Sequence, residues 1–180
     1  MKKSLLLVFL FLTTATFAQK YYTKTGLTEF KASVEAFEPV EATNNSTSAI
    51  LNVATGEIAS LLFVKAFNFR VALMQEHFNE NYMDSNKFPK ATFKGKVEGF
   101  KLSEISDSKE YTIKGTLTIR GVKKEVTTLA KFTKQGDKLR LQASFGVKPE
   151  DFEIKIPKIV SSKIAGTINI ILDYEFIEKK

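Results

Sequence analysis

The side chains best able to do chemistry in this sequence are few. The chain has one histidine, His77, and no cysteine. A metal site or an acid–base pair would have to combine His77 with Glu76 and Glu80. On a helix, Glu76 would point about 100° away from His77, which makes a joint site awkward. We therefore expect His77 to be a helix-surface or rim residue.

Two carboxylates, Asp151 and Glu153, stand one residue apart and would share a face in an extended chain. Such a pair could act as general acid and base, although it is more often a solvated loop edge. The sequence has no G-x-S-x-G nucleophile elbow and no glycine-rich phosphate loop of the Walker or dinucleotide type. These features predict that the protein is not an enzyme and uses no cofactor or metal. An enzyme acting on an apolar substrate is the least favoured hypothesis.

Residues 1–18 are typical of a secretory signal peptide. Lys2 and Lys3 give a basic start, an apolar run covers 5–12, and small residues precede Gln19. The alternative, an anchored membrane helix, would need about 20 apolar residues, and threonines interrupt this run. No cysteine follows the run, so a thiol-acylated lipoprotein is excluded. We expect cleavage after Ala18, a mature domain over 19–180, and a periplasmic or secreted protein.

The composition favours a solvated domain with an aromatic interior. The formal net charge is +7, which falls to +5 without Lys2 and Lys3, and the lysines are scattered. This charge predicts no nucleic-acid partner and suits a transient contact with a membrane surface. Without cysteine, burial rather than disulfides must stabilise the fold. The chain holds 16 Phe and no Trp, and these rings could fill a barrel or line a pocket.

Period-two alternation of apolar and polar residues dominates the chain and predicts half-buried strands. The clearest run is 111–120, with Tyr111, Ile113, Leu117 and Ile119 on one face. Similar alternation or strand-like composition marks the other expected strands, at 21–33, 46–53, 57–69, 92–100, 126–133, 138–145 and 164–176.

These runs predict one all-β domain with one short helix. No linker or internal repeat divides the chain, and short turns at 120–124 and 135–137 suit hairpins. Eight antiparallel strands joined mostly by short turns favour a closed barrel, which leaves no free edge. We therefore expect a closed antiparallel eight-stranded barrel, with a two-sheet sandwich as the alternative.

One segment, 70–83, has helical rather than strand periodicity. Val71, Met74, Phe78 and Tyr82 are spaced as one face of a helix, and polar residues occupy the other face. The segment lies between two strands, so the helix is expected to cross one end of the barrel. It could be a plug that seals the core or a lid over a cavity mouth, and the sequence leaves both open.

Several blocks of the sequence resemble the YceI-like family. Two of them are Leu-Met-Gln-Glu-His-Phe-Asn-Glu-Asn-Tyr at 73–82 and Gly-Thr-Leu-Thr-Ile-Arg-Gly-Val-Lys-Lys at 115–124. Residues 21–53 match only loosely. Lys148 replaces an arginine often seen in the family, and the family's DFG-like step reads Asp-Phe-Glu at 151–153. The remaining blocks lie at 67–70, 87–95 and 145–157, so that the resemblance covers most of 57–176 in order.

This resemblance implies a lipocalin-like eight-stranded barrel with an apolar tunnel that holds polyisoprenoid chains such as quinone tails. It also implies a periplasmic or secreted location and no general enzymatic activity. A true lipocalin is disfavoured, because its Gly-x-Trp signature cannot occur in a chain without tryptophan. An eight-stranded barrel is wide enough either to be filled by side chains or to hold one small ligand.

We therefore predict an exported lipid-binding protein that holds a long apolar chain, such as a polyisoprenoid, inside its barrel. The bound lipid would be the ligand and partner, and no cofactor is expected. The alternative is a filled-barrel envelope stress or interaction protein without a small-molecule ligand. The predicted ligand-binding residues come from the helix face, the phenylalanines that flank it and the clearest strands. They are Phe67, Phe69, Met74, Phe78, Phe88, Phe93, Ile113, Leu117, Phe145 and Ile168.

Overall fold

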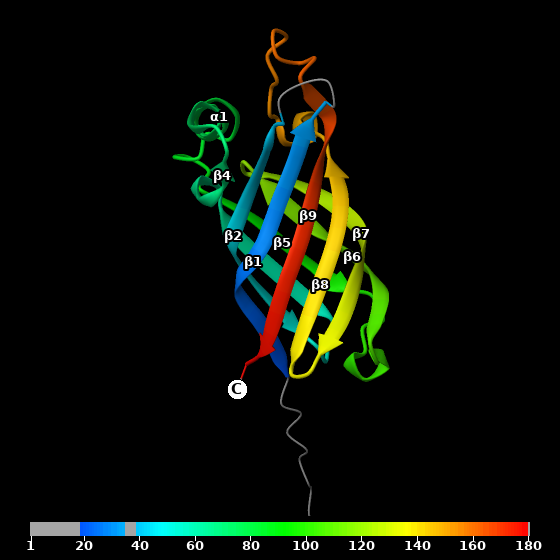
Figure 1. Ribbon diagram of the computed structural model, residues 1–180. Helices are drawn as coiled ribbons and strands as arrows, with labels where there is room; N and C mark the ends of the chain where they lie inside the picture. Colours follow the sequence, from blue (N-terminus) through cyan, green and yellow to red (C-terminus); the bar gives the residue numbers. More distant parts are fainter. Residues whose placement is uncertain (1–18, 35–38, 180) are drawn as a thin grey trace, which may run out of the picture.

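The computed structural model describes residues 19–34 and 39–179 (Figure 1). The predicted signal peptide, residues 1–18, lies outside the described residues. Nine strands make up most of the described chain. They are β1 (Lys20–Ser33), β2 (Glu41–Asn52), β3 (Glu57–Phe63), β4 (Asn68–Phe69), β5 (Lys90–Val97), β6 (Ser108–Ile119), β7 (Val122–Gln135), β8 (Lys138–Val147) and β9 (Ile164–Glu178).

The strands form a closed barrel. Each long strand pairs antiparallel with its neighbours in the order β1-β9-β8-β7-β6-β5-β3-β2, and β1 pairs back with β2. The two-residue β4 only extends the sheet beside β2. The predicted closed eight-stranded antiparallel barrel is confirmed, and the sandwich alternative is wrong. Closure satisfies the backbone hydrogen bonds that an open sheet would leave at its edges.

The hairpin turns follow from local backbone geometry. Ile119 pairs with Val122, so that Arg120 and Gly121 form a two-residue loop. Both loop residues have positive φ, 52° and 79°, as a type I′ turn requires. The β7–β8 turn likewise contains Gly136 at φ 60°. The short turns predicted at these two places are confirmed.

The helical segment is shorter than its apolar spacing predicts. The α-helix α1 covers Ala72–His77 and continues as a π-helical turn, η2, over Phe78–Tyr82. Val71 is the N-cap residue, and its backbone is extended (φ −115°, ψ 119°). A β-branched residue is well suited to this extended conformation. Short 3-10 turns also occur at η1 (Val64–Ala66), η3 (Leu102–Glu104) and η4 (Pro149–Phe152).

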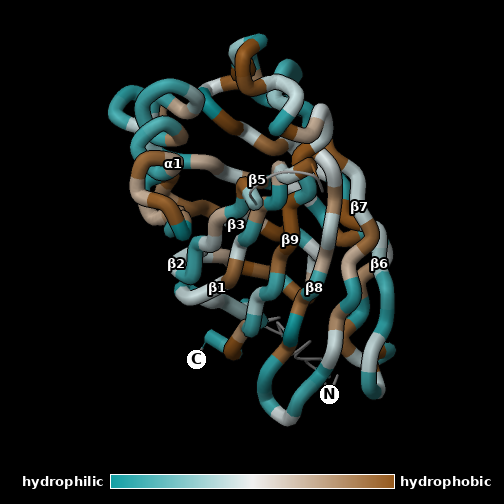
Figure 2. Tube along the Cα trace, turned by 45° about the horizontal axis from the view of Figure 1, so that its top comes forward, coloured by the Kyte–Doolittle hydropathy of each residue, from teal (hydrophilic) through white to brown (hydrophobic). Residues whose placement is uncertain are grey.

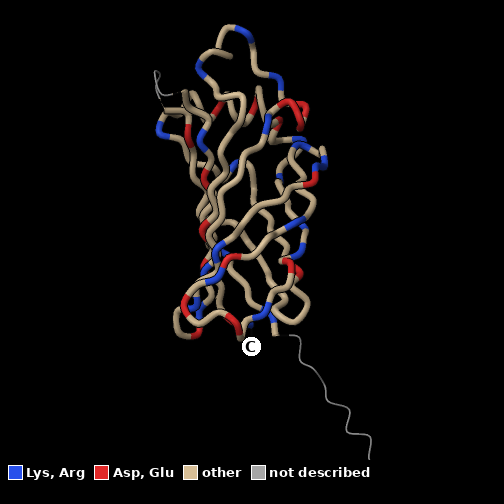
Figure 3. Tube along the Cα trace, turned by 90° about the vertical axis from the view of Figure 1, so that its right-hand side faces the viewer, with Lys and Arg blue, Asp and Glu red and all other residues tan. Residues whose placement is uncertain are grey.

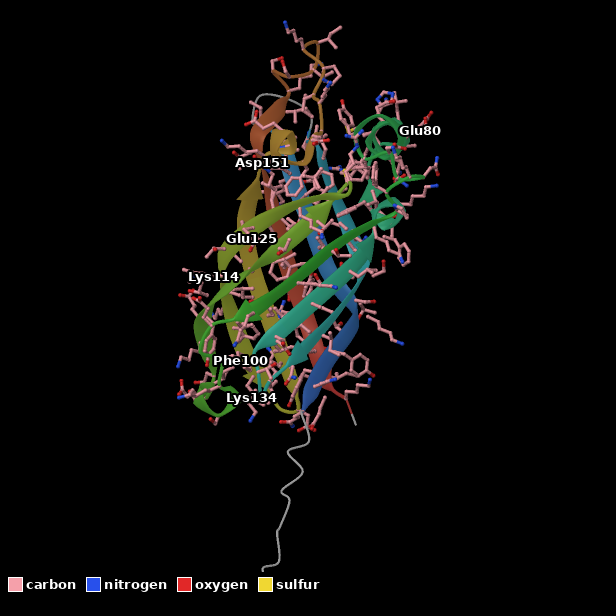
Figure 4. The ribbon with its side chains drawn as sticks, turned by 180° about the vertical axis from the view of Figure 1, so that it is seen from behind. Glu80, Phe100, Lys114, Glu125, Lys134 and Asp151 are labelled. Atoms are coloured by element: carbon pink, nitrogen blue, oxygen red, sulfur yellow. The ribbon has the colours of Figure 1, made fainter. Side chains whose placement is uncertain are left out.

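The two ends of the barrel differ. We call the end that carries α1, η4 and residues 153–163 the open end, and the end with η3 and the β7–β8 turn the closed end (Figure 1). Seen from behind, Phe100 and Lys134 lie at the closed end, whereas Glu80 and Asp151 lie at the open end (Figure 4). This asymmetry sets the position of the candidate site.

Aromatic and aliphatic side chains fill the closed end. The rings of Phe100, Tyr111 and Phe132 pack with centroid distances of 5.1 to 5.8 Å. Phe132 and Phe176 have no exposed surface. Such close packing of buried side chains leaves little room for a ligand in this half. The hydropathy colouring shows apolar residues alternating along the strands, as one inward face requires (Figure 2).

Candidate ligand-binding site

An apolar cavity of about 400 Å³ occupies the barrel toward the open end. This volume lies within the range typical of small-molecule pockets. Side chains from β1, β3 and β5 to β9 form its wall, and α1, η2, η4 and residues 154–163 surround its mouth. The barrel is therefore hollow toward one end and filled at the other. The fully filled barrel is not what the structure shows.

Nine of the ten predicted ligand-binding residues line this cavity. They are Phe67, Phe69, Met74, Phe78, Phe93, Ile113, Leu117, Phe145 and Ile168. The strand members share inward-facing positions, because alternate residues along a strand point to the same side of the sheet. The structure thus brings together residues that are more than 100 positions apart in the chain.

Phe88 is the predicted residue that is not part of the lining. It precedes β5 in the turn where the Phe88 amide donates to the Asp84 carbonyl (2.8 Å). Its ring lies beside Gly121 and 5.9 Å from the guanidinium carbon of Arg120. Phe88 and Phe93 are five residues apart, so their positions do not share the period of two that aligns inward side chains.

Four phenylalanine rings form one wall near the mouth. Phe78, from the π-helical turn, stacks on Phe30 of β1 at 5.3 Å and lies 5.7 and 5.1 Å from Phe67 and Phe69. Pairs at these separations add to the hydrophobic contribution of each ring. The helix is therefore anchored by its apolar face at the edge of the cavity. Met74, His77 and Phe78 all face the cavity, which supports the interpretation of the helix as a lid.

The floor of the cavity carries hydroxyl groups. The Thr28 Oγ1 atom lies 2.8 Å from Thr47 Oγ1 and 3.0 Å from Tyr174 Oη, and all three residues are buried. Thr28, Tyr174 and Ser60 line the cavity. Burial raises the pKa of Tyr174, so its hydroxyl stays neutral. The deep end therefore offers neutral hydrogen-bonding groups and no fixed charge.

Two glycines shape the wall beside this floor. Gly95 of β5 faces Gly115 of β6, and the Phe93 ring lies across both. A methyl group at either position would come within 2.6 or 2.7 Å of that ring. Phe93 also packs against the filled core of the closed end. It therefore forms part of the boundary between the filled half and the cavity.

The candidate catalytic groups do not assemble into a site. His77 is exposed at the cavity rim, and Glu76 and Glu80 are exposed on the same helix. Across 19–34 and 39–179, no three His, Asp or Glu side chains are placed to hold a metal ion. The extended conformation assumed for Asp151 and Glu153 is wrong, because η4 is a 3-10 turn and Glu153 has a left-handed backbone (φ 57°).

The loop around η4 instead contributes apolar lining. Phe152 is buried and borders the cavity, followed by Ile154, Ile156 and Val160. The Arg120 guanidinium donates to the Glu153 carbonyl (2.7 Å) and holds this segment to the β6–β7 turn. Sequence reasoning missed these residues because the segment has no strand or helix period. Phe30 was missed for a different reason, as it lies in the region where the family resemblance is loose.

Replacing His77 with alanine is expected to leave both folding and lipid retention nearly unchanged. The side chain is exposed at the rim and forms no metal cluster with described residues. Ordinary surface substitutions change stability by less than about 0.5 kcal/mol. Urea denaturation and the lipid content of the purified variant measure the two properties. A folded variant that has lost its lipid would assign His77 a direct role.

Fold and cavity together define a class of protein, a small closed β-barrel with an apolar pocket open at one end. Residues 13–176 match the model of the YceI-like domain. The chain therefore belongs to the YceI-like family, and the resemblance noted from its sequence is confirmed. Among curated proteins, none matches this chain.

Solved structures share the fold at low sequence identity. A polyisoprenoid binding domain from Saccharophagus degradans, implicated in plant cell wall breakdown, has a TM-score of 0.74 at 12% identity, covering 90% of this chain and 99% of that one. BcnA from Burkholderia cenocepacia has a TM-score of 0.69 at 18% identity, with 83% and 95% covered. The Campylobacter jejuni YceI protein has a TM-score of 0.64 at 21% identity, with 80% and 88% covered.

The helices of the described chain are short. None of them has both the length and the apolar character needed to cross a membrane.

Proposed function

We propose that this protein binds one long apolar lipid of the polyisoprenoid type and carries out no catalysis. The observation that carries the proposal is the cavity, whose lining is almost entirely aliphatic and aromatic and which opens at one end. The Saccharophagus degradans domain of the same fold is described as polyisoprenoid binding, which supports this ligand class.

The cavity can supply affinity without a charged contact. Each buried CH2 group contributes about 0.8 kcal/mol, so a few isoprene units offset the cost of ordering the chain. A volume of about 400 Å³ holds only part of a long lipid. The rest of the chain would pass between α1 and residues 154–163 at the open end. The hydroxyl groups of the floor would accept a neutral polar terminus or remain paired with one another.

The proposed setting is outside the cytoplasm. Residues 1–18 have the pattern of a signal peptide, and export would place the barrel in the periplasm or the medium. An apolar carrier is useful in such a compartment because a long prenyl chain is almost insoluble in water. The absence of cysteine is compatible with this setting, since the fold does not depend on disulfides.

The test is native mass spectrometry, with lipid extraction, of protein purified gently from its own host. We expect an adduct of about one long-chain lipid per barrel. The mass of the polypeptide should be that of a chain starting at Gln19. Added decaprenol should raise the melting temperature of the lipid-free protein, because a ligand bound only to the folded state stabilises it. Repeated recovery of empty protein, together with no stabilisation by decaprenol, would contradict the proposal.

A further inference from the structure

The loop that follows η4 projects beyond the barrel rim at the open end (Figure 1). Local hydrogen bonds shape its tip, including those from the Val160 amide to Pro157 O (3.0 Å) and from the Lys163 amide to Val160 O (2.9 Å). Ile159, at this tip, is 86% exposed, the most exposed of the large apolar side chains described. Single exposed apolar residues are common on protein surfaces. The exposure of Ile159 is informative because of the residues around it.

The apolar lining of the cavity continues onto this loop. Ile154, Ile156 and Val160 border the cavity, while Ile159 of the same ten-residue stretch faces solvent. An apolar path therefore leads from the interior of the barrel to its outermost point.

The charges on this segment are all positive. Residues 154–172 include Lys155, Lys158 and Lys163 and contain no Asp or Glu. Figure 3 shows Lys and Arg, in blue, on the projecting loop and Asp and Glu, in red, nearer the barrel. Three acidic residues, Glu150, Asp151 and Glu153, precede this segment at the base of the loop, and Asp151 lies 3.9 Å from the Lys124 ammonium nitrogen. The projecting tip is thus basic and apolar.

The segment at α1 adds a second group of exposed apolar side chains at the same end. Leu73 of α1 is 57% exposed, and Val71, two residues earlier, is 36% exposed. Arg70 precedes them, and the acidic residues Glu76 and Glu80 come later on the segment. Apolar side chains flanked by basic ones are the pattern by which peripheral elements bind the interface of an anionic bilayer. Figure 1 shows both projections at the same end of the barrel, and residues of both segments line the cavity.

We propose that the open end docks on an anionic phospholipid bilayer, with Ile159 and Leu73 entering the headgroup region and Lys155 and Lys158 contacting lipid phosphates. The inference rests on the proposed function for its purpose, since docking would place the cavity mouth directly against the store of apolar lipid. Vesicle binding itself can be measured whether or not the cavity holds a lipid.

The experiment is co-sedimentation of the purified protein, its processed N-terminus checked by intact mass, with phosphatidylglycerol/phosphatidylcholine vesicles and with phosphatidylcholine vesicles. We expect binding to the anionic vesicles that weakens as salt is raised. Ile159→Ser should weaken binding several-fold. The double variant Lys155→Gln/Lys158→Gln should weaken it by about fivefold for each lysine removed.

The controls place the same changes on the barrel wall. Leu129 is 60% exposed on β7, and Lys131 and Lys134 are exposed on the same strand. Leu129→Ser and Lys131→Gln/Lys134→Gln should bind vesicles as the unmodified protein does. Equal losses in the control variants, or equal binding to both vesicle types, would overturn the docking proposal. The proposal would also be overturned if the protein bound neither vesicle type and Ile159→Ser converted a dimer into a monomer. The loop would then contact a second copy of the chain.

Discussion

Replacing Phe132 with alanine is expected to destabilise the protein by about 3–5 kcal/mol, the cost of an unrelaxed void in a packed core. Phe132 has no exposed surface, and its ring lies 5.1 Å from Phe100 and 5.8 Å from Tyr111. Phe132 belongs to the filled half, so the loss in the free energy of unfolding should be the same with and without bound lipid. Urea denaturation of lipid-free and lipid-loaded protein measures both values.

The matched variant is Phe78→Ala at the mouth. Phe78 is only half-buried and borders space that is vacant without lipid, so truncation removes fewer packing contacts. We expect its cost to the lipid-free protein to be less than about 2 kcal/mol, with faster loss of bound lipid. Equal destabilisation by the two variants would mean that both halves of the barrel are packed alike.

Placing a phenyl ring inside the cavity is expected to reduce lipid retention at least tenfold. Ala143 of β8 is buried, borders the cavity and pairs with Ala130 and Leu172 on the neighbouring strands. In Ala143→Phe the new ring would occupy space that we assign to the ligand. Overpacking typically costs about 1–3 kcal/mol, which a fold of this size can tolerate. The lipid-to-protein ratio after gentle purification is the measurement.

The control for this prediction adds the same ring outside the barrel. Leu129 is exposed and neighbours Ala130, but it points to the opposite side of β7. Leu129→Phe should keep both its lipid and its melting temperature. If Ala143→Phe folded normally and still retained its lipid, the ligand would have to bind somewhere other than this cavity.

Much of the barrel could be predicted because each strand has one solvent-facing side and one buried side. The alternation from Tyr111 to Ile119 shows which side chains of β6 point inward, and the structure places Ile113, Leu117 and Ile119 in the cavity lining. The Arg120-Gly121 turn is equally local, since Gly121 takes the positive φ that the second position of a type I′ turn requires. Such features need no knowledge of distant contacts.

The parts that could not be predicted depend on contacts between distant strands. In β1 the register shifts on either side of Gly26, where a methyl group would come within 2.6 Å of the Tyr174 ring. This irregularity interrupts the alternation that would have marked Phe30 as inward. The floor was also missed, because Thr28 and Thr47 resemble solvent-facing threonines until Tyr174 is placed beside them. Phe152 lies in a 3-10 turn without a periodic signal.

The filled closed end has a consequence for the kinetics of exchange, because it leaves the open end as the route for a ligand. A ligand that enters a blind pocket must leave by the route it came, so an incoming molecule cannot push the resident one through. Release should therefore be a first-order process whose rate does not depend on the concentration of a competing lipid. The filled closed end, with Phe132 and Phe176 fully covered, would stay folded throughout. Each molecule could then load and unload many times without unfolding between cycles.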